Sequence, residues 1–168
     1  PTLTKVEVSS TNANTQGQLE QLAKAGDTIT LTVESSEALK SLSVGDGQGN
    51  PTPLNPVGDS GREWTLSDTV ESGDNGELSF TLNYEDLAGN VGASVSNTTN
   101  NSKISFDTTP PSLSDVVLAS TNANDSIRFA KEDDELILTF NSSELIVNCE
   151  IVNLMICSNI YLDMYLFV

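Results

Sequence analysis

Apolar and polar residues alternate along several short runs of the chain. Ile29, Leu31 and Val33 alternate with threonine, and from Leu78 to Tyr84 every second residue is apolar. A period of two predicts strands with one buried face and one wet face, as in antiparallel sheets. No segment sustains an apolar period of 3.6 residues, and the best helical candidate, residues 18–24, is one or two turns at most.

About seven such runs fall within the first 109 residues, and turns rich in glycine and asparagine separate them. This number and spacing of strands predict an all-β fold, an immunoglobulin-like antiparallel β-sandwich. Trp64 and Tyr84 lie in alternating runs, so we expect burial between the sheets rather than an exposed platform for sugars. The expected strands are residues 3–9, 27–34, 39–45, a short one near Leu54, 62–70, 77–84, and 91–95 resuming at 103–107.

The chain repeats itself after 110 residues. Residues 1–14 and 111–124 share eight identities in fourteen positions, and residues 23–37 and 130–144 share eight in fifteen. A repeat of this length predicts tandem modules. We expect a complete repeat over residues 1–109 and the start of a second, truncated repeat over residues 110–145, whose two strand-sized runs cannot bury a core alone. The chain therefore reads as a piece of a longer protein.

Residues 146–168 do not conform to the repeat. Seventeen of these 23 residues are apolar, and glycine, proline, threonine, lysine and arginine are all missing. The polar residues interspersed among them leave no clean run of 18, which argues against a transmembrane helix. We interpret this segment as a frame error or an unrelated gene end; the alternative is a divergent final strand or two.

The amino-acid composition argues against several classes of function. Twenty-four acidic residues against seven basic ones give a net charge of −17. An acidic surface repels phosphate backbones and anionic headgroups, so we expect no nucleic-acid partner and no insertion into membranes. Histidine is absent, which removes the usual general base and the commonest zinc ligand. We therefore expect no enzyme.

Several motifs occur in an order that resembles the bacterial immunoglobulin-like repeats of large surface and secreted adhesin-type proteins. The resemblance covers residues 1 to about 145 and implies an extracellular, cell-surface array without catalysis, stiffened in some relatives by calcium. The motifs are Ser-Thr-Asn-Ala-Asn at residues 10–14, Gly-Asp-Thr-Ile-Thr-Leu-Thr at 26–32 with Ser36-Glu37, Trp-Thr-Leu at 64–66, Asp-Leu-Ala-Gly-Asn at 86–90 and Ser-Phe-Asp-Thr-Thr-Pro-Pro at 105–111.

Calcium is the cofactor that the topology suggests. In an immunoglobulin-like fold, the turn with Glu37 and the turn with Glu85, Asp86 and Asn90 lie where the chain enters the module. Oxygen ligands converging from two turns and a linker suit Ca²⁺. For the second repeat, the matching ligands are Asp107 of the linker and Glu144, an incomplete set. Alternatively, Asp86 and Asn90 cap their own turn, with Gly89 at positive φ.

Two functions remain after an enzyme is set aside. The first is a non-catalytic extracellular spacer in a bacterial surface or secreted protein, whose partners are the neighbouring repeats of its own chain. The second is an adhesion module that binds carbohydrate or protein through its loops. A ligand-binding module predicts exposed aromatic residues or a defined pocket at one end, and the sequence shows neither.

Overall fold

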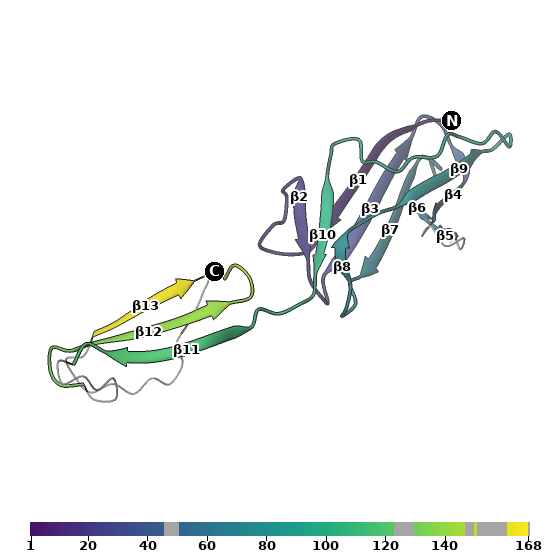
Figure 1. Cartoon of the computed structure of the whole chain (residues 1–168). Helices are drawn as coiled ribbons and strands as arrows, with labels where there is room; N and C mark the ends of the chain where they lie inside the picture. The colour runs from purple at the N-terminus through teal and green to yellow at the C-terminus, as the bar shows by residue number, and fades with distance from the viewer. Residues whose placement is uncertain (46–50, 123–129, 147–149, 151–160, 168) are drawn as a thin grey trace. The chain divides into compact units, whose positions relative to one another are not determined.

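The computed structural model describes residues 1–45, 51–122, 130–146, 150 and 161–167 (Figure 1). The chain divides into two compact units, Pro1–Thr109 and Pro110–Val168. Within the described residues every regular element is a strand, so the fold is all-β as the sequence predicts. The described residues of the first unit form ten strands, several of only two to four residues, where the sequence predicts about seven.

One four-stranded antiparallel sheet forms half of the first unit, in the order β1-β3-β7-β6 (Figure 1). Its register aligns Val6 with Val33 and Val33 with Trp64, and all three side chains are buried. The intervening threonines and glutamates face outward, as the period of two predicts. The strands are β1 (Leu3–Ser10), β3 (Thr28–Ser35), β6 (Asn55–Pro56) and β7 (Glu63–Thr69).

A second sheet, in the order β5-β4-β9, supplies the opposite half of the core. It consists of β4 (Leu39–Gly45), β5 (Pro51–Pro53) and β9 (Thr81–Asp86). Leu42 faces Tyr84 across the register, and both are buried in one cluster with Val6, Val33 and Trp64 of the first sheet. Two antiparallel sheets that share one apolar cluster form a β-sandwich. The expected burial of Trp64 and Tyr84 is confirmed.

The third sheet shows that the helical candidate at residues 18–24 is wrong. Residues Glu20–Ala23 form β2, which pairs in parallel with β10 (Lys103–Asp107), and β10 pairs on its other side with β8 (Asn75–Glu77). Gln21 and Ala23 are buried and Leu22 is exposed, so the local period is two. The Gln21 amide also accepts the Ser10 N–H at 2.7 Å, which gives this polar side chain a reason to face inward.

The strand expected over residues 77–84 is interrupted. Its first part belongs to β8 in the third sheet and its second part to β9 in the second sheet, and residues 78–80 cross between them. The expected last strand is similarly divided: Val91 and Val95 make isolated bridges to β9, and β10 follows after a loop. Both strands change sheets because their two ends pair with different neighbours.

The second unit reproduces the first pair of strands. Strand β11 (Leu113–Ser120) pairs with β12 (Glu135–Ser142), and Leu113↔Ser142 matches Leu3↔Ser35 of the first unit. Val116, the counterpart of Val6, is 58% exposed whereas Val6 is 0% exposed. In the described part of this unit, no counterpart of the β5-β4-β9 sheet covers that face.

The non-conforming tail contributes one strand to the second unit. Strand β13 (Tyr161–Phe167) pairs in parallel with β12, whereas the corresponding neighbour of β3, which is β7, is antiparallel. The tail therefore departs from the repeat in pairing as well as in composition. Residues 147–149, 151–160 and 168 lie outside the described residues, and the origin of the tail as a frame error stays a prediction.

Candidate calcium ligands and the ends of the units

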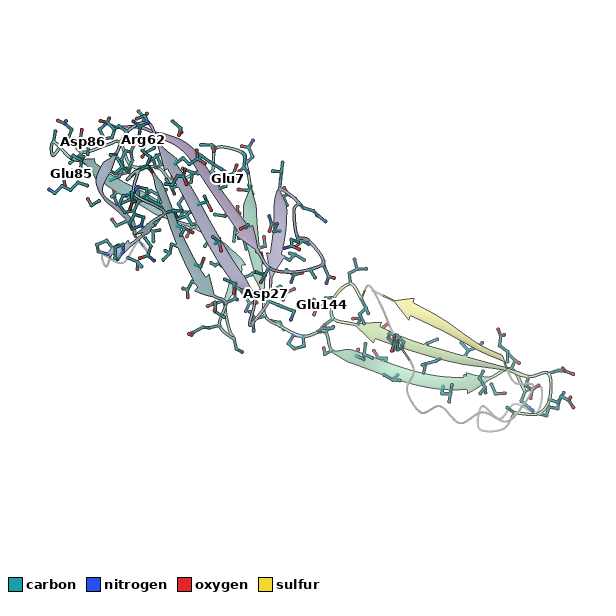
Figure 2. The ribbon with its side chains drawn as sticks, turned by 180° about the vertical axis from the view of Figure 1, so that it is seen from behind. Glu7, Asp27, Arg62, Glu85, Asp86 and Glu144 are labelled. Atoms are coloured by element: carbon teal, nitrogen blue, oxygen red, sulfur yellow. The ribbon has the colours of Figure 1, made fainter. Side chains whose placement is uncertain are left out.

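Four of the expected calcium ligands lie at one end of the first unit. Strand β4 begins opposite the end of β9, with Leu39 aligned to Asp86, so the turn with Glu37 and the turn after Glu85 are neighbours. Figure 2 shows Glu85 and Asp86 together at this end and Asp27 at the other end of the unit. Among the described residues, no group of three or more Asp, Glu, Cys or His side chains is arranged to hold a metal ion.

Asp86 already has hydrogen-bond partners in its own turn. Its Oδ1 accepts the backbone N–H groups of Ala88 and Asn90 at 2.8 Å each, and its Oδ2 accepts the Asn90 side-chain amide at 2.8 Å. The hydrogen bonds from Asn90 are the main cause that lowers the pKa of Asp86. Gly89 has φ of 92°, so the turn takes the self-capped form that the sequence allows as an alternative to calcium.

The two glutamates at this end differ in their contacts. Glu85 Oε1 lies 3.0 Å from Lys40 Nζ, across the β4–β9 pair. The Glu37 side chain is exposed, and its backbone carbonyl accepts the Ser35 hydroxyl at 2.7 Å. A calcium ion here would therefore have to compete with a lysine ammonium for Glu85.

The other two expected ligands belong to different units. Asp107 ends β10 of the first unit, where its Oδ1 accepts the Thr109 N–H at 3.2 Å. Glu144 follows β12 in the second unit, and its backbone N–H donates to Ser142 Oγ at 3.4 Å. The contacts of Asp107 and of Glu144 are thus each made within their own unit. Calcium binding stays a prediction.

A polar network at the opposite end of the first unit escaped the sequence analysis. Asp27 Oδ2 accepts the Asn12 side-chain amide and the Lys24 N–H, each at 2.8 Å. Asn12 is buried, and its own N–H donates to Ser10 Oγ. The Lys24 N–H is the main cause that lowers the pKa of Asp27, and the Asn12 amide adds to it.

The same network recurs in the second unit. Asp134 Oδ2 accepts the Asn122 amide at 2.6 Å and the Lys131 N–H at 2.8 Å, and these hydrogen bonds lower the pKa of Asp134. Asp133 takes φ of 72° where the first unit has Gly26 at 88°. The identities between the repeats therefore preserve one hydrogen-bonded structure. Their recurrence in both copies was the signal that could have identified the network from sequence.

The start of each unit is fixed by a pair of hydrogen bonds, which we call the N-terminal clamp. In the first unit, Thr2 N–H donates to Ser36 Oγ at 3.1 Å and Ser36 N–H donates to Thr2 O at 2.9 Å. In the second unit, Ser112 and Ser143 make the same two bonds, both at 3.0 Å. The Ser-Ser-Glu identity between the repeats therefore has a structural role at the start of each unit.

The end of the first unit is fixed by a second set of bonds, the C-terminal clamp. Thr108 Oγ1 accepts the Gly73 N–H at 3.0 Å, and the Thr108 N–H donates to Asn75 Oδ1 at 3.2 Å. The residue after β10 is thus held against the turn that precedes β8. Between Thr108 of this clamp and Ser112 of the next N-terminal clamp, only Thr109, Pro110 and Pro111 remain.

Comparison with known proteins adds no family to this picture. A scan against protein-family models found no match, and a search among curated proteins found none either. Over the described part of the chain, there is no helix whose length and apolar character would allow it to cross a membrane.

Proposed function

We propose that this chain is a non-catalytic spacer from a repetitive bacterial surface or secreted protein of the adhesin type, which acts outside the cell through its length and stiffness. The observation that carries the proposal is the pair of clamps on either side of the linker. They leave three residues between two hydrogen-bonded ends, and two of the three are proline. A proline has a fixed φ and restricts the residue before it, so little rotational freedom remains.

The repeated Asp27 and Asp134 networks give the proposal further support. In a spacer made of repeated units, each unit folds through the same interactions. Both units here pair their first two strands in a matching register and keep the same hydrogen bond from an asparagine amide to an aspartate carboxylate. Neither network is arranged for catalysis, because each carboxylate already accepts hydrogen bonds from donors of its own unit. Neighbouring repeats of the same chain are then the expected partners.

Stiffness is testable by distance measurements between the units. Spin labels are attached in the full chain at Asp59→Cys and Val117→Cys, two exposed positions, after Cys149 and Cys157 are replaced with serine. We expect a narrow distance distribution that becomes roughly twofold wider when Thr109-Pro110-Pro111 is replaced by Gly-Ser-Gly, because such a sequence behaves as a flexible coil. An equally broad distribution before and after the replacement would refute the spacer proposal.

The calcium hypothesis is tested in the same experiment. Binding at Glu37, Glu85, Asp86 and Asn90, at the end of the first unit away from this linker, would give heat in a calorimetric titration and leave the distance distribution unchanged. If the partial set of Asp107 and Glu144 on either side of the linker binds Ca²⁺, calcium narrows the distribution and EDTA restores its width. Calcium would then neutralise repulsion between carboxylates and restrict the angle between modules. An unchanged distance distribution, together with no heat in a calorimetric titration of the chain, would contradict the calcium hypothesis. It would not affect the conclusion about the stiffness of the linker.

A ligand-binding adhesion module is the second candidate function. It is favoured by one specific observation, an apolar hollow beside an unpaired strand edge in the first unit. That hollow lies within the sandwich rather than in the loops at its ends.

A further inference from the structure

The hollow lies between the two facing sheets of the first unit and has a volume of about 430 Å³. Protein pockets that accept ligands commonly measure roughly 300–1,000 Å³. Its apolar walls come from both sheets and from the crossing segment at residues 78–80, and most of the side chains are only half-buried. They are Ile29, Leu31, Leu66, Val44, Leu78 and Phe80.

Two short strands lie on the side of the sandwich where the hollow opens. Strand β6 pairs with β7 only through Asn55↔Thr65 and Pro56↔Trp64. Strand β5, on the other sheet, pairs only with Ser43–Gly45 of β4. Beyond these pairs, no strand of the described residues closes this side of the sandwich; residues 46–50, which lie between Gly45 and Thr52 of the hollow, are outside the described residues.

The open side coincides with a free edge of β7. Val70 N–H donates to Asp27 O on the β3 side, whereas Glu63 O accepts Val57 N–H on the β6 side. Because bonding direction alternates along an antiparallel strand, Ser67 and Thr69 direct their backbone groups away from β3. Thr69 N–H is bonded to Asp68 Oδ1 at 2.8 Å, but no strand of the described chain pairs with Ser67 on this edge.

The charge beside this edge is negative. Asp68, Asp74 and Glu77 line an adjoining hollow that shares Ile29 and Leu78 with the first. Glu77 lies 3.6 Å from Lys103, but no lysine or arginine among the described residues forms an ion pair with Asp68 or Asp74. A basic group of a partner would find uncompensated carboxylates here.

We propose that the β7 edge binds an extended peptide segment of a partner protein by strand addition. The peptide backbone pairs with Ser67, one large apolar side chain enters the hollow between Leu66 and Phe80, and a basic side chain follows beside Asp68. A peptide is the occupant that fits, because backbone donors and acceptors at a strand edge are satisfied by another strand. This binding role goes beyond the spacer function and does not depend on it.

The probe is a synthetic seven-residue peptide that alternates leucine or phenylalanine with threonine and ends in lysine. We expect the full chain to bind it with amide shifts concentrated on residues 66–69 in an NMR titration. A matched peptide that is N-methylated on its pairing edge should bind at least tenfold more weakly, and so should one with serine in place of its apolar residues. Equal binding of the N-methylated peptide would point to an apolar small-molecule site and overturn the proposal.

Two variants of the chain test the same contacts. Ser67→Pro removes the outward N–H at a position where an edge strand tolerates proline, and it should abolish measurable peptide binding. Asp68→Asn should weaken binding about threefold, since exposed charge pairs contribute little, and the exposed Asp59→Asn is its control. Unaltered thermal unfolding confirms that each variant is folded. Full binding by folded Ser67→Pro, or concentration-dependent self-association that the peptide does not displace, would contradict the proposal.

Discussion

Replacement of Leu82 with alanine is expected to lower the free energy of unfolding of the first unit by about 3 kcal/mol. Leu82 is fully buried on β9, in the cluster that joins the two sheets. Truncation of a buried leucine costs roughly 2–5 kcal/mol, because apolar contacts are lost and a cavity remains. Urea unfolding followed by the fluorescence of Trp64, the single tryptophan, reports on this unit alone.

Leu87→Ala is the matched control for this prediction. Leu87 is 71% exposed in the turn after β9, so the same chemical change should alter the unfolding free energy by no more than about 0.5 kcal/mol. Similar losses for the two variants would mean that the two sheets do not share a core around Leu82.

The second large effect is expected at Asp27. Asp27→Ala removes the acceptor of the Asn12 amide and the Lys24 N–H, and it leaves a buried asparagine without that partner. Hydrogen bonds to a charged group contribute roughly 1.5–3 kcal/mol, so we expect a loss of about 2 kcal/mol. The control Asp59→Ala, at an exposed position, should change the free energy of unfolding little. An equally small change for Asp27→Ala would show that the network does not stabilise the unit.

Asp27 also gives stability a pH dependence. The pKa of its carboxyl is lowered in the folded unit from an ordinary value of 3.8, chiefly by the Lys24 N–H. Its contribution is therefore complete above that ordinary value and is lost as the pH falls through the lower folded pKa. Unfolding curves between pH 5 and pH 2 should show a smaller acid-dependent loss for Asp27→Asn than for the unaltered chain.

Strands whose pattern is local could be predicted from the sequence. The run from Leu39 to Gly45 coincides with β4, and the expected strand at residues 3–9 differs from β1 by one residue. In β1 every second side chain from Val6 onward is buried, and β4 buries Leu39 and Leu42 on either side of a bulge. Trp64 is buried for the same reason, because its strand has one face toward the core.

Strands whose pairing is distant could not be predicted in the same way. Strand β2 exists because Gln21 and Ala23 face inward beside β10, a partner some eighty residues further along the chain. The break at residues 78–80 likewise depends on two neighbours in two different sheets. Local periodicity carries no information about which strand will be the neighbour.

At the candidate site too, local motifs could be predicted from the sequence and distant contacts could not. The turn from Asp86 to Asn90 could be anticipated as a self-capped turn, because a short aspartate-to-asparagine spacing with an intervening glycine is a local motif. The bond between Asn12 and Asp27 spans fifteen residues and a strand, and only its recurrence at Asn122 and Asp134 hints at it.

The ordered linker between the two clamps is the central claim, and NMR relaxation of the backbone tests it most directly. We expect ¹⁵N order parameters of about 0.8 or higher at Thr108, Thr109 and Ser112, close to the values of the neighbouring strands. Values below about 0.6 at these amides, with rigid strands on both sides, would show a flexible tether and contradict the account.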